Sequence, residues 1–273
     1  MIWCRFESAD GPSYGLVEGN VVRQVKGVPW GDHEITSVQY LLDSVKLLLP
    51  VVPVTAFASG LNYAKHTIDG LTKFGIKDPK LPSRAIIAYW ANSALIAHGE
   101  AIIRPADSEG DFQYEGELVA VIGKRAKNVS REDALDYVFG WTIGNDVSER
   151  AWQKKDPTLL RSKNCDTFKP MGPWIVTGLD PKDMRTTVRV NGVVLDEFDT
   201  GNMLFDVATH IHNITRYCTL QPGDVIWFGT DGVPQNMSPG DVVEVEISGI
   251  GTLRNPVEAG NRKLAEQPEA SKK

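Results

Sequence analysis

The chain has 273 residues, of which 42% are apolar and 23% are charged, a composition typical of a globular protein rather than a disordered one. Its 29 basic and 35 acidic residues give a net charge of −6, which argues against a nucleic-acid partner or an anionic membrane surface. Three cysteines without a CxxC pair favour a reducing compartment. The sequence has no apolar run of membrane length and no signal-peptide pattern at its start, so we expect a cytoplasmic protein with no membrane partner.

Residues 1–53 predict a small β-rich N-terminal region. Short β-type segments flank a Gly19-Asn20 turn signal, and residues 37–49 are compatible with one helix. Pro50 and Pro53 then interrupt the chain, because proline disfavours helix at its own position and at the residue before it. We therefore place a domain boundary there, with residues 54–273 as a larger second domain.

The second domain is predicted to consist mostly of strands. Turn signals bound many of the short β-branched or alternating runs, which occupy residues 85–90, 117–122, 188–190, 224–228 and 241–247. Two helices are expected, one over residues 130–138 with Ser130 as its N-cap and one over residues 203–217, where apolar residues recur at helical spacing. The pattern indicates a β-rich α+β fold.

Glu115 and Glu117 lie at the start of the strand predicted over residues 117–122. Side chains alternate along an extended backbone, so both carboxylates are expected on one face. Two adjacent acids repel each other unless a cation lies between them. A solvated strand end is the alternative interpretation.

Asp146 follows an apolar, strand-like run over residues 140–144. It is placed either to cap the next helix or to form a third carboxylate that faces Glu115 and Glu117. Three carboxylates make a site of hard oxygen ligands, which suits Mg²⁺, Mn²⁺ or Ca²⁺ better than zinc.

His66 and Asp69 are three residues apart, which makes them neighbours if the segment is helical. A carboxylate that orients an imidazole is the arrangement of a general base, and an ordinary surface pair is the alternative. Residues 64–80 are rich in lysine and glycine, and we interpret them as a mobile lid because the candidate base lies at their start.

Residues 161–173 form a cation-rich segment that is predicted to be a loop. A lysine such as Lys163 would hold a substrate carboxylate or an enolate oxygen here, or would simply be solvated. Cys165 has no histidine placed near it by the sequence, so an inert cysteine is favoured over a nucleophile.

The order and spacing of these motifs resemble the fumarylacetoacetate hydrolase family over roughly residues 55–257. The matching motifs are Gly60-Leu61-Asn62-Tyr63 with His66, Glu115-x-Glu117, Asn145-Asp146-Val147-Ser148 with Arg150 and Gln153, Lys163 with Asp166-Thr167-Phe168, and the segments Pro222-Gly223-Asp224-Val225 and Pro239-Gly240-Asp241-Val242. The resemblance implies a β-rich α+β fold of mixed packed and rolled sheets, with residues 1–53 as a small N-terminal region and residues 54–273 as the catalytic domain of a homodimer.

The resemblance also implies a site. It assigns a divalent cation, Mg²⁺ or Mn²⁺ with Ca²⁺ as an alternative, to Glu115, Glu117 and Asp146. By the same resemblance catalysis falls to His66, Asp69 and Lys163, and substrate binding to Arg150, Gln153 and Thr230.

Members of this family act on 2-oxo acids or their enols. The resemblance therefore implies a metal-dependent hydrolase that cleaves a carbon–carbon bond in a 2-oxo acid such as an acylpyruvate, through a stabilised enolate. The alternatives are an oxaloacetate-type decarboxylase, a hydratase or isomerase of the same family, and a non-catalytic 2-oxo acid binder. Asp69 stands where family hydrolases usually carry Glu, and the loop 229–234 departs from the usual pattern, so the substrate is left open.

Overall fold

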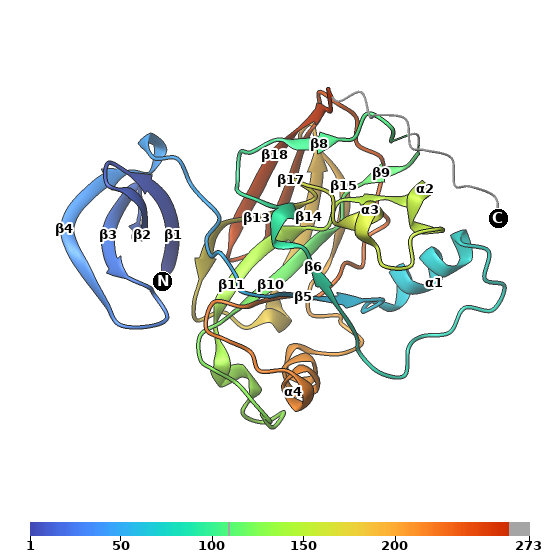
Figure 1. Ribbon diagram of the computed structural model, residues 1–273, viewed down its shortest axis with the longest axis horizontal. Helices are drawn as coiled ribbons and strands as arrows, with labels where there is room; N and C mark the ends of the chain where they lie inside the picture. Colours follow the sequence, from blue (N-terminus) through green and yellow to red (C-terminus); the bar gives the residue numbers. More distant parts are fainter. Residues whose placement is uncertain (109, 262–273) are drawn as a thin grey trace, which may run out of the picture.

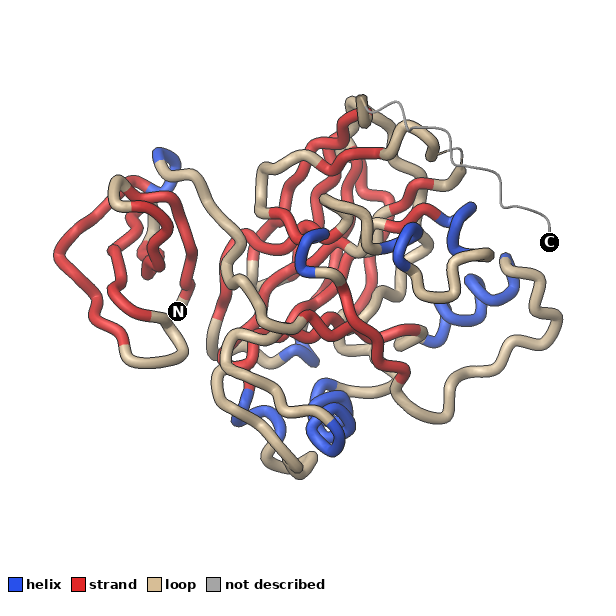
Figure 2. Tube along the Cα trace, in the orientation of Figure 1, coloured by secondary structure: helices blue, strands red, loops and turns tan. Residues whose placement is uncertain are grey.

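The computed structural model describes residues 1–108 and 110–261. Figures 1 and 2 show a molecule built mainly of strands, with short helices at the right and the bottom of the view and an N-terminal lobe at the left. This is the β-rich α+β fold that the sequence predicts. Among the described residues, no helix is long and apolar enough to cross a membrane.

A large mixed sheet runs from the N-terminal lobe through the centre of the molecule. In spatial order its strands are β4-β3-β2-β1-β13-β11-β10-β16-β5-β6, and β7 pairs with β13. Their bounds are β1 Ile2–Ser8, β2 Gly11–Glu18, β3 Val21–Gly27, β4 His33–Leu41, β5 Ala56–Gly60, β6 Ile86–Trp90, β7 Leu95–Ile96, β10 Gly116–Ile122, β11 Val138–Asn145, β13 Lys169–Val176 and β16 Val225–Trp227.

A second sheet packs against the central strands of the first. Its order is β15-β14-β17-β18-β8, and a separate pair joins β12 to β9. The bounds are β8 Ile102–Arg104, β9 Phe112–Gln113, β12 Ser148–Glu149, β14 Arg185–Val190, β15 Val193–Asp199, β17 Val242–Ile247 and β18 Gly251–Ala259. Leu118 and Ile143 of the first sheet share one apolar core with Val188, Val245 and Leu253 of the second.

Strand β10 lies at the centre of this arrangement and is buried along its whole length. Leu118 faces the core between the sheets, whereas Val119 and Val121 face a second apolar cluster on the opposite side. At Gly116 the two sheets approach so closely that a Cβ would lie 2.9 Å from the side chains of Val188 and Val245. The residues on either side of Gly116 are therefore held by a dry and rigid backbone.

The helices are short and connect the strands. Their bounds are α1 Ala64–Lys73, α2 Arg150–Gln153, α3 Leu160–Lys163 and α4 Val207–Tyr217, with 3₁₀ turns η1 Leu42–Ser44, η2 Asn92–Ala94, η3 Ala134–Tyr137 and η4 Pro181–Asp183. Helix α4 confirms the helix expected over residues 203–217, although it begins at Val207, where the Asp206 carboxylate caps it by accepting from the Thr209 N–H at 2.8 Å. The segment interpreted as a lid, residues 64–80, is helical only as far as Lys73.

The helix predicted over residues 37–49 is wrong. Strand β4 continues to Leu41 and only the single turn η1 follows. Strand β4 pairs with β3 from Val21 opposite Leu41 to Gly27 opposite His33, so the ladder satisfies the backbone groups that a helix would have satisfied internally. Tertiary pairing overrides the weak local helix preference here.

The N-terminal lobe is hydrogen-bonded to the central sheet, because β1 pairs with β13 through Ile2 and Trp3. The expected Gly19-Asn20 turn joins β2 to β3. The chain leaves the lobe through an irregular segment that contains Pro50 and Pro53. The division into domains of residues 1–53 and 54–273 stays a prediction.

The helix predicted over residues 130–138 is shorter than expected. The Ser130 hydroxyl accepts from the Asp133 N–H at 3.2 Å, as a capping side chain would. Only the 3₁₀ turn η3 follows, because β11 begins at Val138. The five predicted strand segments all contain strands in the structure, namely β6, β10, β14, β16 and β17.

Candidate active site

Three carboxylates meet where β10 begins and β11 ends. Glu115 and Glu117 flank Gly116, which pairs with Asn145 on β11, and Asp146 is the next residue. The Asn145 amide oxygen accepts from the Glu115 N–H at 3.0 Å, and the Glu115 carbonyl accepts from the Asp146 N–H at 2.8 Å. The antiparallel ladder thus brings residues about thirty positions apart together. We call Glu115, Glu117 and Asp146 the acidic triad.

The acidic triad is buried rather than solvated. Its members are 4%, 2% and 1% exposed, and one carboxylate oxygen from each lies within 4.8 Å of the other two. The solvated strand end considered for the glutamates is therefore wrong. Asp146 is also not the cap of the next helix, because the Glu149 carboxylate accepts from the Ala151 N–H at the start of α2.

Lys163 bridges two members of the acidic triad. It lies at the end of α3 and is 6% exposed. Its Nζ donates to Glu115 Oε2 at 2.7 Å and also to Asp146 Oδ2. Burial alone would lower the pKa of Lys163, but the Asp146 and Glu115 carboxylates raise it above its usual value. The lysine is therefore a fixed ammonium at the centre of the site.

The pKa values of the two glutamates of the acidic triad are shifted in opposite directions. Burial raises the pKa of Glu115, but Arg150, Lys163 and His66 outweigh burial and hold that pKa well below its usual value. For Glu117, burial and the charges of Asp146 and Glu115 raise the pKa well above the usual range.

Glu117 is the member of the acidic triad whose environment leaves room for another positive charge. Among the described residues it has no ion pair, and its Oε2 accepts from the Gly229 N–H at 2.8 Å. Three buried hard-oxygen donors, one of them without a cationic partner, fit a divalent cation of the Mg²⁺, Mn²⁺ or Ca²⁺ type.

His66 lies in the first turn of α1 and reaches the acidic triad. Its Nδ1 is 2.8 Å from the Gly232 carbonyl, and its Nε2 is 3.2 Å from Glu115 Oε1. Burial lowers the pKa of His66, but the Glu115 hydrogen bond and charge and the Gly232 carbonyl raise it overall. Because Gly232 offers only an acceptor, Nδ1 carries a proton and Nε2 is the atom that faces the site.

Asp69 is on the same helix but is not the partner of His66. It is half-buried, and among residues 1–108 and 110–261 no hydrogen bond or ion pair joins it to the imidazole. The ring turns instead toward Gly232 and Glu115. The acid that contacts the histidine is thus Glu115, which directly precedes β10 and is far away in the sequence.

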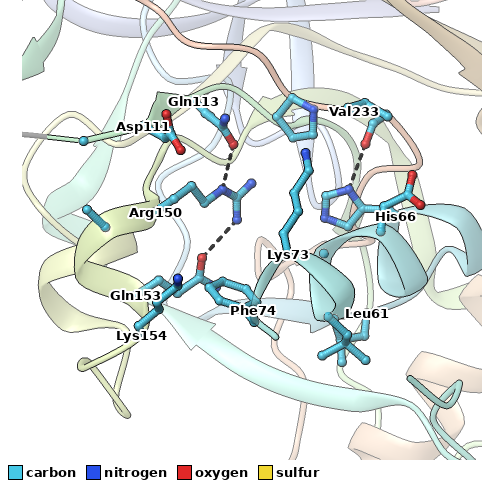
Figure 3. Close-up of a pocket in the computed structure, with 17 residues that line it drawn as sticks. Leu61, His66, Lys73, Phe74, Asp111, Gln113, Arg150, Gln153, Lys154 and Val233 are labelled. Atoms are coloured by element: carbon cyan, nitrogen blue, oxygen red, sulfur yellow. Dashed lines mark hydrogen bonds between the residues drawn. The ribbon is translucent and has the colours of Figure 1, made fainter. Parts of the chain in front are cut away.

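Arg150 and Gln153 lie together on α2. Arg150 Nε donates to Gln113 Oε1 at 3.0 Å and Nη1 donates to Gln153 Oε1 at 3.1 Å, as Figure 3 shows, while Nη2 pairs with Glu115. Thr230 follows β16 and is 5% exposed. Its hydroxyl accepts from the Gly232 N–H at 3.4 Å, so it supports the turn that contacts His66.

A cavity of about 590 Å³ opens beside these groups. It is lined by Leu61, His66, Asp69, Gly70, Leu71, Lys73, Phe74, Gly110, Asp111, Gln113, Arg150, Ala151, Gln153, Lys154, Gly232, Val233 and Pro234 (Figure 3). His66 and Arg150 connect this cavity to the acidic triad, because both line it and both contact Glu115. We call the outer lining residues Lys73, Phe74, Lys154, Val233 and Pro234 the rim.

The rim was missed by sequence reasoning, although it bounds the cavity. Lys154 Nζ lies 5.9 Å from the centre of the Phe74 ring, so α2 and the end of α1 meet across the opening. The signal in residues 64–80 is their lysine and glycine content, and that composition does not indicate which side chains face inward. Gln113 was missed because its only signal is a position two residues before Glu115.

The aromatic residues near the motifs are mainly structural. Tyr63 and Phe168 are fully buried, and the Tyr63 hydroxyl donates to the Thr200 carbonyl at 2.6 Å. Trp90 is 7% exposed and its ring lies 5.6 Å from Lys163 Nζ. Cys165 donates its thiol to the Arg161 carbonyl, and burial raises the pKa of that thiol, as expected for an unreactive cysteine.

The fold and the acidic triad define a class of protein, and comparison with known proteins identifies it. The model for the fumarylacetoacetate (FAA) hydrolase C-terminal domain matches residues 55–258, and a model described as Rv2993c-like, N-terminal matches residues 1–50. The chain therefore belongs to the fumarylacetoacetate hydrolase family, as the motifs predict.

Three similar proteins carry different activities in their names. Oxaloacetate tautomerase YisK of Bacillus subtilis is 32% identical over 82% of this chain and 77% of its own. The 2-hydroxyhepta-2,4-diene-1,7-dioate isomerase of Mycobacterium marinum superposes with a TM-score of 0.86 at 35% identity, covering 96% of this chain and all of its own. Maleylpyruvate hydrolase from Sphingobium sp. SYK-6, in complex with manganese(II) and pyruvate, has a TM-score of 0.74 at 25% identity over 96% of this chain and all of its own. Membership of the family thus makes this protein an enzyme of a group that includes tautomerases, isomerases and hydrolases.

Proposed function

We propose that this protein is a divalent-metal-dependent enzyme that forms the enolate of a 2-oxo acid, and that it uses the enolate to cleave a carbon–carbon bond by hydrolysis. The observation that carries the proposal is the buried ammonium of Lys163 between Glu115 and Asp146. A fixed positive charge in a dry site stabilises the negative charge that develops on an enolate oxygen. The neighbour from Sphingobium is named as a complex with manganese(II) and pyruvate, which supports this ligand class.

The acidic triad would hold the cation, Mg²⁺ or Mn²⁺ with Ca²⁺ as an alternative. When bound there, the ion would supply Lewis-acid polarisation of the 2-oxo group. Arg150 is placed to bind the substrate carboxylate, because its guanidinium faces the cavity and already binds a carboxylate, that of Glu115. Gln153 holds Arg150 Nη1, and Thr230 supports the Gly232 turn.

His66 is the proposed base. With Nδ1 held by the Gly232 carbonyl, the neutral ring would have to release the Nε2 contact with Glu115; Nε2 would then take a proton from water, and the water oxygen would add to the carbonyl carbon at C4. The C3–C4 bond then breaks and its electron pair enters the enolate beside Lys163. The proton on His66 returns to C3, giving a shorter 2-oxo acid and a carboxylic acid.

Tautomerisation is the second candidate, and the placement of His66 favours it. Both ring nitrogens are engaged, by Gly232 and by Glu115, and Asp69 does not contact the ring. Enol–keto exchange needs only the movement of a proton between C3 and the 2-oxo oxygen, with no attacking water. The tautomerase name of the Bacillus relative supports this candidate, and decarboxylation of oxaloacetate would use the same enolate.

A substrate panel with a His66 variant separates these reactions. We expect wild type to exchange C3 protons of a 2-oxo acid in D₂O, measured by NMR, and to release pyruvate from an acylpyruvate. In His66→Gln hydrolysis should fall about a hundredfold or more, with exposed His33→Gln as the matched control. Pyruvate release that survives unchanged in His66→Gln would contradict the hydrolytic role of His66, and a panel with neither exchange nor release would favour the non-catalytic binder.

The role of Asp69 stays a prediction that the same assay tests. If Asp69 were the acidic partner of His66, Asp69→Asn would reproduce most of the His66→Gln defect. The geometry leads us to expect less than about a fivefold loss, which is the effect of a partly exposed charge near a site. A loss as large as that of His66→Gln would restore the sequence-based assignment.

The homodimer and the cytoplasmic location also stay predictions. The edge strand β6 exposes Ile86 and Tyr89 at 41% and 56%, and exposed apolar side chains on an edge strand suit a contact with a second copy. Light scattering after gel filtration would give twice the chain mass for a dimer and the chain mass for a monomer.

A further inference from the structure

Lys169 is a second lysine beside the acidic triad, and nothing in the proposed chemistry uses it. It begins β13, and its side chain is 0% exposed. Its Nζ lies 4.8 Å from the centre of the Trp90 ring. Because a buried ammonium costs free energy unless it is fully paired, the partners of Lys169 indicate what it does.

Four oxygens surround the ammonium of Lys169. Its Nζ is 2.7 Å from Asp146 Oδ1 and 3.3 and 3.2 Å from the carbonyls of Val147 and Phe168, and it also donates to the carbonyl of Lys163. One side of this cluster is the turn after β11, and the other is the end of α3. Lys169 therefore ties the segment that carries Asp146 to the segment that carries Lys163.

The cluster also divides the Asp146 carboxylate between two lysines. Lys163 Nζ forms an ion pair with Oδ2, and Lys169 Nζ forms one with Oδ1. With Arg150 on Glu115, three buried or half-buried cations oppose the three carboxylates of the acidic triad. The site thus has no excess of negative charge before any metal ion enters, and an incoming divalent cation is repelled by an ammonium that shares one of its ligands.

We propose that Lys169 is a positioning residue that fixes Asp146 and Lys163 relative to each other and weakens the hold of the acidic triad on a divalent cation. The inference rests on the proposed metal centre and goes beyond it, because it assigns two opposite effects to one side chain. Loss of the ammonium strengthens metal binding and loosens the alignment of Lys163 with a 2-oxo acid analogue.

The test measures Mn²⁺ binding by electron paramagnetic resonance in wild type, Lys169→Met and Lys169→Gln. Met matches the length of the lysine chain without its charge, whereas Gln keeps N–H donors for the carbonyls and serves as a second variant if Met prevents folding. Exposed Lys127→Met, whose Nζ donates to the Arg216 carbonyl at 3.4 Å, is the control for a general change in net charge. Oxalate affinity is then measured by calorimetry with each protein saturated in Mn²⁺.

We expect the affinity for Mn²⁺ and the affinity for oxalate to change in opposite directions. Both Lys169 variants should bind Mn²⁺ about tenfold more tightly than wild type, and their oxalate affinity should fall about threefold or more. Lys127→Met should match wild type in both. Detectable Mn²⁺ binding in the variants but not in wild type would support the inference in its strongest form.

Other outcomes would overturn it in distinguishable ways. Wild type and folded Lys169 variants with equal Mn²⁺ affinity, or weaker binding in the variants, would overturn the inference while leaving the metal centre intact. Equal tightening in Lys127→Met would reduce the effect to net charge. Unchanged oxalate affinity would remove the positioning role. No Mn²⁺ binding by any of the proteins would overturn the metal centre together with the inference.

Discussion

The acidic triad and the rim belong to the same site but are held in different ways. The acidic triad lies at the start of β10 and directly after β11, is buried, and is fixed by ion pairs and backbone hydrogen bonds. The rim lies on α1, α2 and a loop, with Lys73 and Lys154 exposed and Phe74 38% exposed. The difference indicates that the sheet positions the carboxylates proposed to act in the reaction, whereas the helices and the loop determine which substrates enter the cavity.

The largest expected effect comes from removing the central ammonium. Lys163→Met should lower kcat about a hundredfold to a thousandfold, because a preorganised charge at a developing oxyanion contributes that much. Lys154→Met on the rim removes the same charge from an exposed position. Because charge interactions are weak at exposed positions, this variant should raise KM less than about fivefold and leave kcat unchanged. Steady-state kinetics on any turned-over 2-oxo acid checks both. A larger kcat defect in Lys154→Met would place the chemistry at the rim.

A second contrast concerns backbone rigidity. Gly144 of β11 lies against the buried Trp227 ring, and a Cβ there would overlap with the ring, whereas nothing lies within 4 Å of a Cβ at Gly70 in α1. Gly144→Ala should therefore lower the free energy of unfolding by about 1–3 kcal/mol or more. Gly70→Ala should raise it by up to about 1 kcal/mol, because alanine is the better helix former.

Urea unfolding followed by circular dichroism would measure both glycine variants. Equal and small changes would mean that the backbone beside the acidic triad accommodates a new side chain as easily as helix α1 does.

The smallest expected effect concerns pH and a buried histidine outside both regions. His210 of α4 is fully buried, with Nε2 2.8 Å from the Ser59 hydroxyl and Nδ1 3.0 Å from the Asp206 carbonyl. Burial lowers the pKa of His210 despite the Asp206 contacts. The folded state thus binds this proton less readily than the unfolded chain, so the contribution to stability is complete above the unfolded pKa of about 6.5 and is lost as the pH falls below it.

His210→Gln should flatten this dependence. Melting temperatures between pH 7.5 and 5 should fall more steeply for wild type than for the variant, with His33→Gln as a control that keeps the wild-type slope. The same slope in wild type and His210→Gln would show that His210 does not titrate on unfolding.

Local patterns account for part of this molecule. Alternation along the strand correctly placed Glu115 and Glu117 on one face, and strand signals located β6, β10, β14, β16 and β17. The expected helix over residues 37–49 failed because its backbone partners lie on β3, and single-segment propensity contains no such information.

The rest of the site depends on contacts between distant segments. The Gly232 carbonyl that binds His66 is 166 residues away, so local spacing suggested Asp69 instead. Lys169 stands in a polar, cation-rich segment that suggests a solvated loop, yet it is fully buried because the turn after β11 and the end of α3 meet around it. Only the packed fold shows which of the cations in that segment enter the site.

The most direct test of the account is thermal unfolding with Mn²⁺, alone and together with oxalate, in wild type, Glu117→Gln and the exposed control Glu258→Gln. A ligand that binds only the folded state raises its stability, so a hundredfold excess of Mn²⁺ over Kd should raise the melting temperature of wild type and control by about 5 °C. Oxalate should raise it further only when Mn²⁺ is present, and Glu117→Gln should lose both increases. No increase in wild type at millimolar Mn²⁺, or an equal increase in Glu117→Gln, would contradict the claim that the acidic triad is a metal centre for 2-oxo acids.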